Sequence, residues 1–258
     1  MLPSLFVSHG SPMLAVTPGP AHEFLTGLGA TLGKPRAIVV ASAHWGTAHP
    51  TVNAVARNTT IHDFGGFPRE LYTLRYDAPG DPTLAEEVAD AIGAAGLEVA
   101  VDRKRGLDHG AWVPLMLAWP QADIPVFQVS VQPSLGPAHH FELGRALAPL
   151  RARDILVVGS GSFTHDLRRY FGQPQETPET PDVTAFAGWM DTALREGRRC
   201  DLLTYRHKAP YAEAEHPTEE HLLPLFVAMG AGGEKLAAER LHTSTAYGVL
   251  RMDAYAFH

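Results

Sequence analysis

The stretch AIVVASAH, residues 37–44, is an almost uninterrupted run of small and β-branched apolar residues that ends in a histidine. A strand with one face in water would alternate apolar with polar residues, so a continuous run predicts a strand that is buried on both faces. Such strands are typical of sheets that are covered by helices on either side. This stretch therefore predicts the centre of a layered fold.

Further strand-like runs share this character, and helical patterns lie between them. The other predicted strands cover residues 5–8, 51–56, 97–102, 124–131 and 154–162, and the predicted helices cover residues 81–96, 138–150, 182–196 and 217–229. Strands that alternate with helices predict an α/β fold, here a single domain over residues 1–258 with a central mixed, mostly parallel sheet covered by helices on both faces. The Pro- and Glu-rich stretch GQPQETPETPD, residues 172–182, is predicted to be a surface loop.

Composition excludes several classes of partner. The chain has 258 residues, 28 acidic and 21 basic side chains and a formal charge of -7, without a cluster of Lys and Arg. Nucleic acids and anionic membranes are therefore not expected as partners. Cys200 is the only cysteine, which rules out an internal disulfide and suits a reducing compartment. With no leader-like N-terminus and no apolar run of about 20 residues, we expect a soluble cytoplasmic protein, either a monomer or a homo-oligomer.

Histidines stand at the ends of the predicted strands. The chain has 14 of them, and His9, His44 and His165 each come directly after a strand-like run. In open α/β sheets, ligands bind in the crevice beyond the carboxyl ends of the strands. A single histidine at a strand end is more often structural, but three such histidines together favour a metal or proton-transfer site. We therefore expect the active site at the C-terminal ends of the strands.

A fourth histidine, His109, lies in RGLDHGAWVPL at the start of an apolar helical pattern. Asp108 is a plausible N-cap of that helix, which would place His109 at the helix entrance and facing the same crevice. The alternative is a turn histidine that is hydrogen-bonded to the backbone. The residues alone leave both interpretations open.

The stretch HPTEEHLLPL, residues 216–225, carries two histidines five positions apart. If Pro217 opens a helix, five residues correspond to about 500° of rotation, so His216 and His221 point about 140° apart and only one is a primary metal ligand. His221 shares a face with later apolar residues, which makes it the inward-pointing one, whereas His216 precedes the helix and suits a capping or supporting role. Glu219 and Glu220 lie on the first turn, where negative charge is favourable.

Six short blocks, in this order, resemble the class III extradiol ring-cleaving dioxygenases, specifically the DOPA dioxygenase-type branch. The blocks are SHGSP, SAHW, IHDFGGFP, LDHGAWVPL, GSGSFTHDL and HPTEEHLLPL, and they cover nearly the whole chain. The resemblance implies that His9, His44 and His221 are the metal ligands. It also implies that His165 is the acid/base residue and that His109 lines the substrate pocket.

The function that this resemblance implies is a non-haem, metal-dependent dioxygenase, which opens the aromatic ring of a DOPA-like catechol in extradiol fashion with O2. Fe(II) is the expected working metal, although Zn(II) can occupy the same ligands. A carboxylate of Glu219 or Glu220 is the alternative third ligand, but the rotational argument favours His221. Two other functions stay open, namely a zinc-dependent hydrolase and a non-catalytic metal-binding or signalling relative of the fold.

Overall fold

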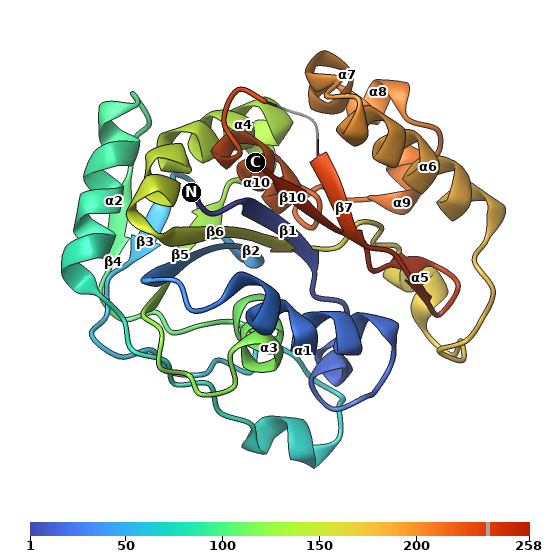
Figure 1. The fold of residues 1–258 in the computed structure, drawn as a ribbon. Coiled ribbons are helices and arrows are strands. Elements are labelled where there is room, and N and C mark those ends of the chain that lie inside the picture. Colours follow the sequence, from blue (N-terminus) through green and yellow to red (C-terminus); the bar gives the residue numbers. More distant parts are fainter. Residues whose placement is uncertain (236–237) are drawn as a thin grey trace.

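One eight-stranded sheet runs through the centre of the molecule, with strand order β4-β3-β5-β2-β6-β1-β10-β7 (Figure 1). The computed structural model describes residues 1–235 and 238–258. The strands are β1 (Ser4–Ser8), β2 (Ala37–Gly46), β3 (Thr51–Asn53), β4 (Ala100–Asp102), β5 (Val126–Val131), β6 (Ile155–Gly161), β7 (Ala238–His242) and β10 (Ala254–Phe257). A separate small ribbon pairs β8 (Thr245–Ala246) with β9 (Leu250–Arg251).

The middle of the sheet is parallel and its margins are mixed. Strands β5, β2, β6 and β1 run in the same direction, with Ile38 opposite both Val126 and Leu156. The pairs β3–β5, β1–β10 and β10–β7 are antiparallel. The predicted α/β fold with a mixed, mostly parallel sheet is therefore confirmed. Parallel neighbours bring their C-terminal ends to one edge of the sheet, which is where a site is expected.

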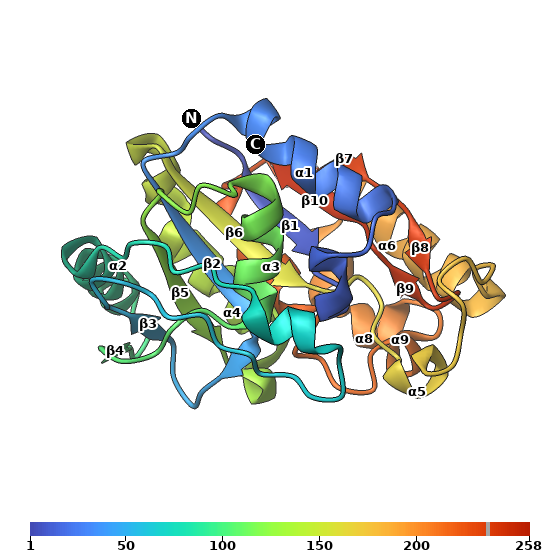
Figure 2. The ribbon, with the colours of Figure 1, turned by 90° about the horizontal axis from the view of Figure 1, so that it is seen from below.

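Helices cover both faces of this sheet. They are α1 (Pro20–Leu32), α2 (Pro82–Ala94), α3 (His109–Ala118), α4 (Gly136–Leu147), α5 (Leu167–Tyr170), α6 (Pro181–Arg195), α7 (Arg199–Leu203), α8 (Tyr205–Lys208), α9 (Ala212–Glu215) and α10 (Leu223–Ala231). Figure 2 shows α1 and α3 lying across one face, whereas Figure 1 shows α2, α4 and α10 on the other. Helix α6 packs against β7, beyond the antiparallel margin.

Alternating side chains of the central strands fill two cores. Ile38 and Val40 of β2 pack in the cluster that contains Trp112 of α3, and Val39 between them packs on the opposite face with Leu143 of α4. Successive strand side chains point to opposite faces, so a strand covered on both sides needs apolar residues at every position. Burying each such side chain contributes about 1.5–3 kcal/mol. This explains the continuous apolar run of β2.

The helix predicted over residues 217–229 is wrong at its start. Residues 217–222 form bends and turns, and α10 begins at Leu223 with Pro224 in its first turn. A helix that started at Pro217 would place Pro224 in its interior, where the ring clashes with the preceding turn and a backbone hydrogen bond is lost. Starting at Leu223 puts that proline where its missing N–H costs nothing.

Other boundaries also differ from the predictions. The strands predicted over residues 51–56 and 97–102 form only at Thr51–Asn53 and Ala100–Asp102. The helix predicted over residues 138–150 begins at Gly136 and gives way after Leu147 to a 3-10 turn containing Pro149. The sequence analysis did not predict α1, β7 or β10. These elements lie near the antiparallel margin of the sheet.

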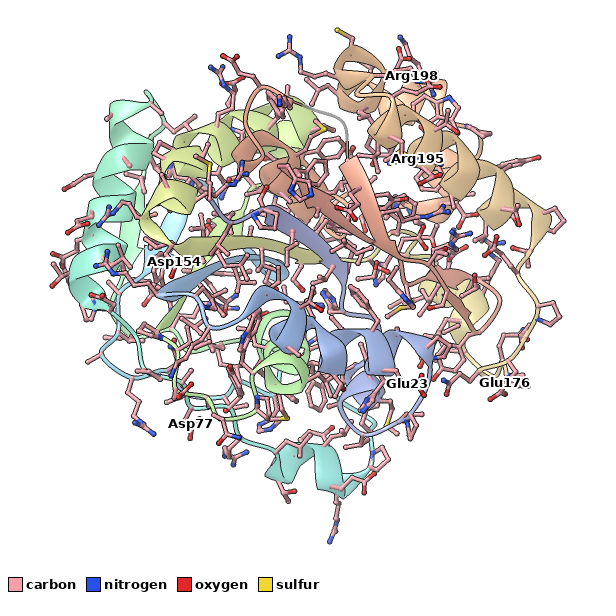
Figure 3. The ribbon with its side chains drawn as sticks, in the orientation of Figure 1. Glu23, Asp77, Asp154, Glu176, Arg195 and Arg198 are labelled. Atoms are coloured by element: carbon pink, nitrogen blue, oxygen red, sulfur yellow. The ribbon has the colours of Figure 1, made fainter. Side chains whose placement is uncertain are left out.

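Charged side chains lie on the surface of the molecule. Glu23, Glu176 and Arg195 are exposed and lie around the outside of the ribbon (Figure 3). The predicted loop over residues 172–182 is irregular up to Thr180, after which α6 begins at Pro181. Within residues 1–235 and 238–258, no helix combines the length and the apolarity needed to cross a membrane.

Candidate functional site

Parallel strands bring four histidines to one edge of the sheet. His9 directly follows β1, His44 lies near the end of β2, His165 follows β6, and His109 is the first residue of α3. The ring centroids of His9 and His44 are 4.9 Å apart, and those of His44 and His109 are 3.9 Å apart. Asp108 caps α3 as predicted, because its side chain accepts a hydrogen bond from the Ala111 N–H. The structure thus gathers these residues at the C-terminal ends of the strands.

His221 reaches the same place from the turn that precedes α10. The Ser162 N–H, just after β6, donates to the His221 carbonyl at 2.8 Å. A Cβ at Gly161 would collide with that carbonyl oxygen, so glycine permits the approach. Because His221 lies outside the helix, the rotational argument that linked it to a helix face does not hold. Its contact with the end of β6 sets its position instead.

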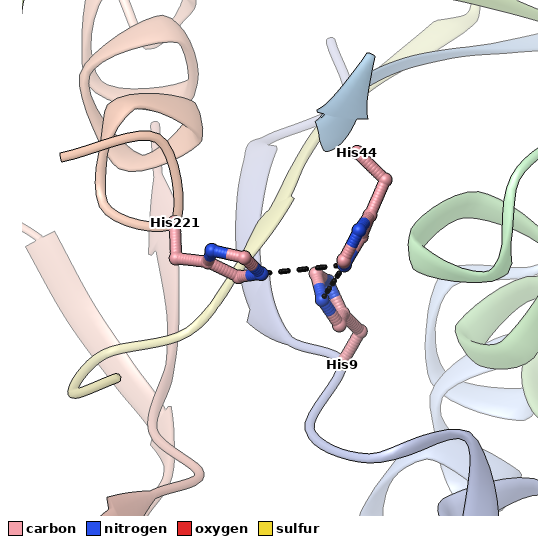
Figure 4. A group of neighbouring side chains, drawn as sticks. All are labelled: His9, His44 and His221. Atoms are coloured by element: carbon pink, nitrogen blue, oxygen red, sulfur yellow. Dashed lines mark hydrogen bonds between the residues drawn. The ribbon is translucent and has the colours of Figure 1, made fainter. Parts of the chain in front are cut away.

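Three ring nitrogens face one another at the centre of this group (Figure 4). His44 Nε2 lies 3.0 Å from His9 Nε2 and 3.3 Å from His221 Nε2. Two imidazole nitrogens bound to one ion at about 2.1 Å lie about 3.0 Å apart at a right angle and about 3.4 Å apart at a tetrahedral angle. A single Nε2 has one lone pair or one hydrogen and cannot satisfy both neighbours by hydrogen bonding. The spacing therefore fits a shared metal ion.

A serine sets the tautomer of His9. Ser160 Oγ donates to the Gly110 carbonyl and lies 3.0 Å from His9 Nδ1. With its hydrogen used on Gly110, the hydroxyl accepts from His9, so Nδ1 carries the proton. His9 Nε2 is then free to bind a cation. Gly110 is needed at this contact, since a Cβ there would crowd Ser42 and the rings of His44 and His9.

Carboxylates stand behind the other two rings. Glu220 Oε1 lies 3.1 Å from His221 Nδ1, and Asp63 Oδ2 lies 3.6 Å from His44 Nδ1. Glu220 can only accept, so its hydrogen bond favours the proton on His221 Nδ1, whereas Asp63 acts on His44 Nδ1 through its charge, because 3.6 Å is too long for a hydrogen bond. Metal-binding histidines commonly have such a partner, which orients the ring and raises its basicity. The set of contacts leaves all three Nε2 atoms directed at one point.

Burial keeps these rings neutral. It lowers the pKa of His9 and of His221 well below the usual 6.5, and neighbouring imidazoles act in the same direction. Burial and the adjacent His109 lower the pKa of His44 to about 4, although Asp108 and Asp63 oppose the shift. Neutral imidazoles at pH 7 offer lone pairs without first losing protons, as metal binding requires.

His165 is stacked on the ring of His221. The two ring centroids are 3.4 Å apart with an interplanar angle of 13°. The His165 N–H donates to the Glu215 carbonyl at 2.8 Å, which holds the backbone in place. Burial lowers the pKa of His165 to about 4, against the charges of Glu220 and Asp166. Its imidazole is therefore neutral at pH 7 and has a lone pair available.

Asp63 joins His109 to His44, a contact that the sequence analysis missed. Asp63 Oδ1 accepts from the His109 N–H at 2.9 Å, and Oδ2 lies 3.0 Å from His109 Nδ1. Burial raises the pKa of Asp63, but the hydrogen bond and charge of His109 outweigh it and hold the pKa at about 2. The signal was present, because Asp63 is the only carboxylate in IHDFGGFP. The side chain of His109 therefore lies beside a carboxylate.

His216 does not join the three facing histidines. It is fully buried, and its Nε2 lies 3.0 Å from the Phe163 carbonyl. It ends α9 instead of capping α10. Glu219 accepts hydrogen bonds through its backbone carbonyl from Leu222 and Leu223. Of the two glutamates in HPTEEH, Glu220 is thus the one beside the rings.

A cavity of about 550 Å³ opens beside the histidines. His44, His109, His165 and His221 line one end, and the loop of residues 64–67 contributes Phe64 and Phe67 to the wall. A volume of this size lies within the range of about 300–1,000 Å³ for small-molecule sites. The predicted crevice at the strand ends is therefore a pocket next to the three facing nitrogens.

Comparison with known proteins gives consistent results. Residues 3–257 match the family model described as catalytic LigB subunit of aromatic ring-opening dioxygenase. A 4,5-DOPA dioxygenase extradiol of Beta vulgaris is 46% identical, covering 98% of this chain and 96% of the relative. The protein of the same name from Escherichia coli K12 is 40% identical over 89% of this chain and 85% of that protein. A crystal structure of an uncharacterized Escherichia coli K12 protein, 32% identical, superposes with a TM-score of 0.81 over 100% of both chains.

Proposed function

The chain belongs to the LigB family and is an extradiol aromatic ring-opening dioxygenase, and we propose that His9, His44 and His221 hold its catalytic ferrous ion. The observation that carries this proposal is the convergence of three Nε2 atoms, with separations of 3.0 and 3.3 Å from His44. Imidazole ligands suit both iron and zinc. When bound, Fe(II) supplies the redox chemistry by which triplet O2 reacts with a singlet aromatic ring.

His9, His44 and His221 would hold the ion beside the cavity. The cavity touches His44 and His221 directly, so a catechol that enters it reaches the metal-binding end. The ligand set contains no carboxylate, and Glu220 supports His221 from behind at 3.1 Å. We therefore propose the three-histidine version of the site, with Glu220 and Asp63 orienting the ligands.

His165 is proposed to take a proton from a substrate hydroxyl and to return a proton later in the reaction. Support comes from its position on the cavity wall. Burial lowers its pKa to about 4, which leaves the imidazole neutral at pH 7 but makes it a weaker base than a free imidazole. Stacking on His221 keeps its ring next to the metal-binding end. General acid–base assistance of this kind contributes about 10²–10⁴ in rate.

His109 is proposed to donate a hydrogen bond to an oxygen of the bound substrate or of O2. It lines the cavity, and Asp63 lies 3.0 Å from its Nδ1 on the other side of the ring. The charge of Asp63 favours a proton on Nδ1, and Asp63 Oδ1 accepts from the His109 backbone N–H at 2.9 Å, which fixes the position of the residue. Asp63 therefore acts as a positioning residue that links His109 to His44.

A reducing compartment suits this centre, because the working metal must remain ferrous. We propose a cytoplasmic location, supported by the single cysteine, Cys200, which is free and exposed. The expected partners are a catechol-type substrate and O2. Zn(II) is expected to bind the same ligands without supporting oxygen chemistry, since it has no redox activity.

The test is oxygen uptake with 4-methylcatechol after anaerobic loading with Fe(II), with Zn(II)-loaded protein as the control. We expect uptake and a yellow ring-opened product with Fe(II) and neither with Zn(II). Family membership favours this outcome over a zinc-dependent hydrolase or a non-catalytic relative. Ester hydrolysis by the zinc form, without oxygen uptake by the iron form, would contradict the proposal.

A further inference from the structure

The cavity changes character away from the histidines. A second part of its lining, here called the outer wall, consists of Leu167, Tyr170, Phe171, Tyr247 and Leu250. Leu167 is 39% exposed and Phe171 is 73% exposed, so this wall lies towards solvent. The outer wall combines α5 and the residue after it with the β8–β9 ribbon and its turn. Two segments that are far apart in the sequence therefore build one apolar surface at the mouth.

Aromatic rings dominate the outer wall. The rings of Tyr170 and Tyr247 meet edge to face with centroids 4.5 Å apart, and those of Tyr170 and Phe171 do so at 5.3 Å. Aromatic side chains in such arrangements bind further aromatic rings well. Phe171 forms an exposed apolar patch with Leu167 and Tyr170 beside the cavity, and contiguous apolar patches often mark ligand-binding grooves.

The backbone at Tyr247 is strained in order to place its ring there. Its φ is +58°, a left-handed conformation that residues with a Cβ rarely adopt. The Tyr247 N–H donates to the Gln175 carbonyl at 2.9 Å, which holds this conformation. Strain of this type persists where the surroundings enforce it and is frequent at ligand sites.

Charge is missing from the cavity wall. Among the residues that the structure describes, none of those lining the cavity is a lysine, arginine, aspartate or glutamate. Relatives that are named for DOPA act on an amino acid with a carboxylate and an ammonium group. The outer wall is partly open to solvent, so these charges would keep part of their hydration there, but the described lining offers them no ion partner, whereas it does offer apolar and aromatic contacts.

The arginines near the outer wall are engaged elsewhere. Arg169 contacts Asp166, Asp182 and Glu215 at 3.0, 2.6 and 3.0 Å. Arg168 pairs with Asp166, and its side chain is 75% exposed.

The arginine of the β8–β9 ribbon is also paired with carboxylates of the protein. Arg251 contacts Glu179 at 3.1 Å and Asp253 at 2.9 Å, so its charge is balanced within the protein. The neighbouring loop carries Glu176, which is exposed (Figure 3). Together with burial and Tyr170, the Glu176 charge raises the pKa of Tyr247 to about 12. The arginine of this ribbon is therefore already paired with carboxylates of the protein and does not point to a binding partner for a substrate carboxylate.

We propose that the substrate of this chain is a catechol with an uncharged aromatic substituent, which the outer wall binds while the catechol ring lies at the histidines. This inference rests on the proposed function and specifies its substrate class. The cavity of about 550 Å³ is much larger than a bare catechol and has room for a second ring. Apolar and aromatic walls with few polar groups are the usual surroundings of such ligands.

The experiment compares kcat/KM for three probes with the Fe(II)-loaded protein, namely 4-methylcatechol, L-DOPA and 4-phenylcatechol. We expect 4-phenylcatechol to exceed L-DOPA by about tenfold or more, because an aromatic contact replaces unpaired charges. If 4-methylcatechol is turned over and L-DOPA is preferred to 4-phenylcatechol, the substrate class is wrong while the proposed function stands. If none of the three is turned over, the proposed function itself fails.

The variant Phe171→Ala tests the outer wall directly. We expect kcat/KM for 4-phenylcatechol to fall by about five- to tenfold and that for 4-methylcatechol to change by less than about twofold. Leu135→Ala is the matched control, because Leu135 is also a large exposed apolar residue, 49% exposed, and does not line the cavity. Equal losses for both catechols, no loss for either, or the same effect in the control would overturn the role of the outer wall.

Discussion

The substitution Glu220→Gln removes one negative charge from behind a proposed metal ligand. Glu220 Oε1 lies 3.1 Å from His221 Nδ1 and also accepts from Thr218 Oγ1 at 2.9 Å. Glutamine keeps the size of the side chain and an acceptor oxygen, so the main loss is the charge. Hydrogen bonds to charged groups contribute about 1.5–3 kcal/mol, compared with about 0.5–1.5 kcal/mol for neutral ones. The midpoints of these two ranges differ by roughly 1.2 kcal/mol, which corresponds to metal binding that is weaker by nearly tenfold.

The neighbouring residue provides the control. Glu219 precedes Glu220 and carries the same charge, but it is absent from the clusters of side chains whose ligand atoms lie within 4.8 Å of one another. Glu219→Gln is therefore expected to change metal affinity by less than about twofold. Any loss of metal affinity in Glu219→Gln would reflect only the change in net charge. Dissolved salt screens the effect of that charge on a site further away.

The assay is a competition titration of the apo protein with Zn(II) against a chromophoric chelator, with circular dichroism to check the fold. Losses of about 10–100-fold are typical when the partner of a metal-binding histidine is removed, so tenfold is readily measured. Unchanged zinc affinity in Glu220→Gln, or an equal loss in Glu219→Gln, would refute the role of Glu220.

Further predictions concern catalysis and pH. His165→Ala is expected to keep the metal and to bind catechol while kcat falls by about 10²–10⁴; near-normal oxygen uptake would remove His165 from the mechanism. Asp63→Asn weakens the support of His109 at 3.0 Å, so kcat/KM is expected to fall about tenfold; steady-state rates equal to wild type would exclude the positioning role. Because burial lowers the pKa of His44 to about 4, protons compete with metal only in strong acid. Zinc affinity measured from pH 8 to about pH 5 should stay constant; a loss centred near 6.5 would contradict this.

The centre of the fold could be predicted because its strands are covered on both faces. The continuous apolar run of β2 predicts a buried strand, and the same character identifies β5 and β6. The antiparallel margin could not be predicted in this way. Strand β7, AERLH, is only partly buried and carries charges, and β10 has only four residues. Their pairing depends on long-range contacts that periodicity does not reveal.

The site was predicted best where topology alone determines position. His9 and His44 follow from the rule that parallel strands end at one edge. The basis for choosing His221 was a helix that does not exist at that position, although the side chain does face His44. Pro224 in the sequence argues against that helix, because a proline in the interior disfavours a helix that begins seven residues earlier.

The contacts that orient the histidines could not be predicted from the sequence. Ser160 touches His9 across 151 positions of the chain, and Asp63 contacts His109 across 46 positions. Neither contact follows from local propensity, since each depends on how loops and strands pack. Partners of this kind can be identified only from the folded structure, in which the side chains that contact each histidine are known.

The most direct test of the central claim is an anaerobic Fe(II) titration of the wild-type protein and of the variants His9→Ala, His44→Ala and His221→Ala. The account predicts one tightly bound equivalent in the wild type and its loss in each variant, with the fold retained, because each ring supplies one of three nitrogens to a common ion. A variant that keeps a full equivalent at wild-type affinity would contradict the claim.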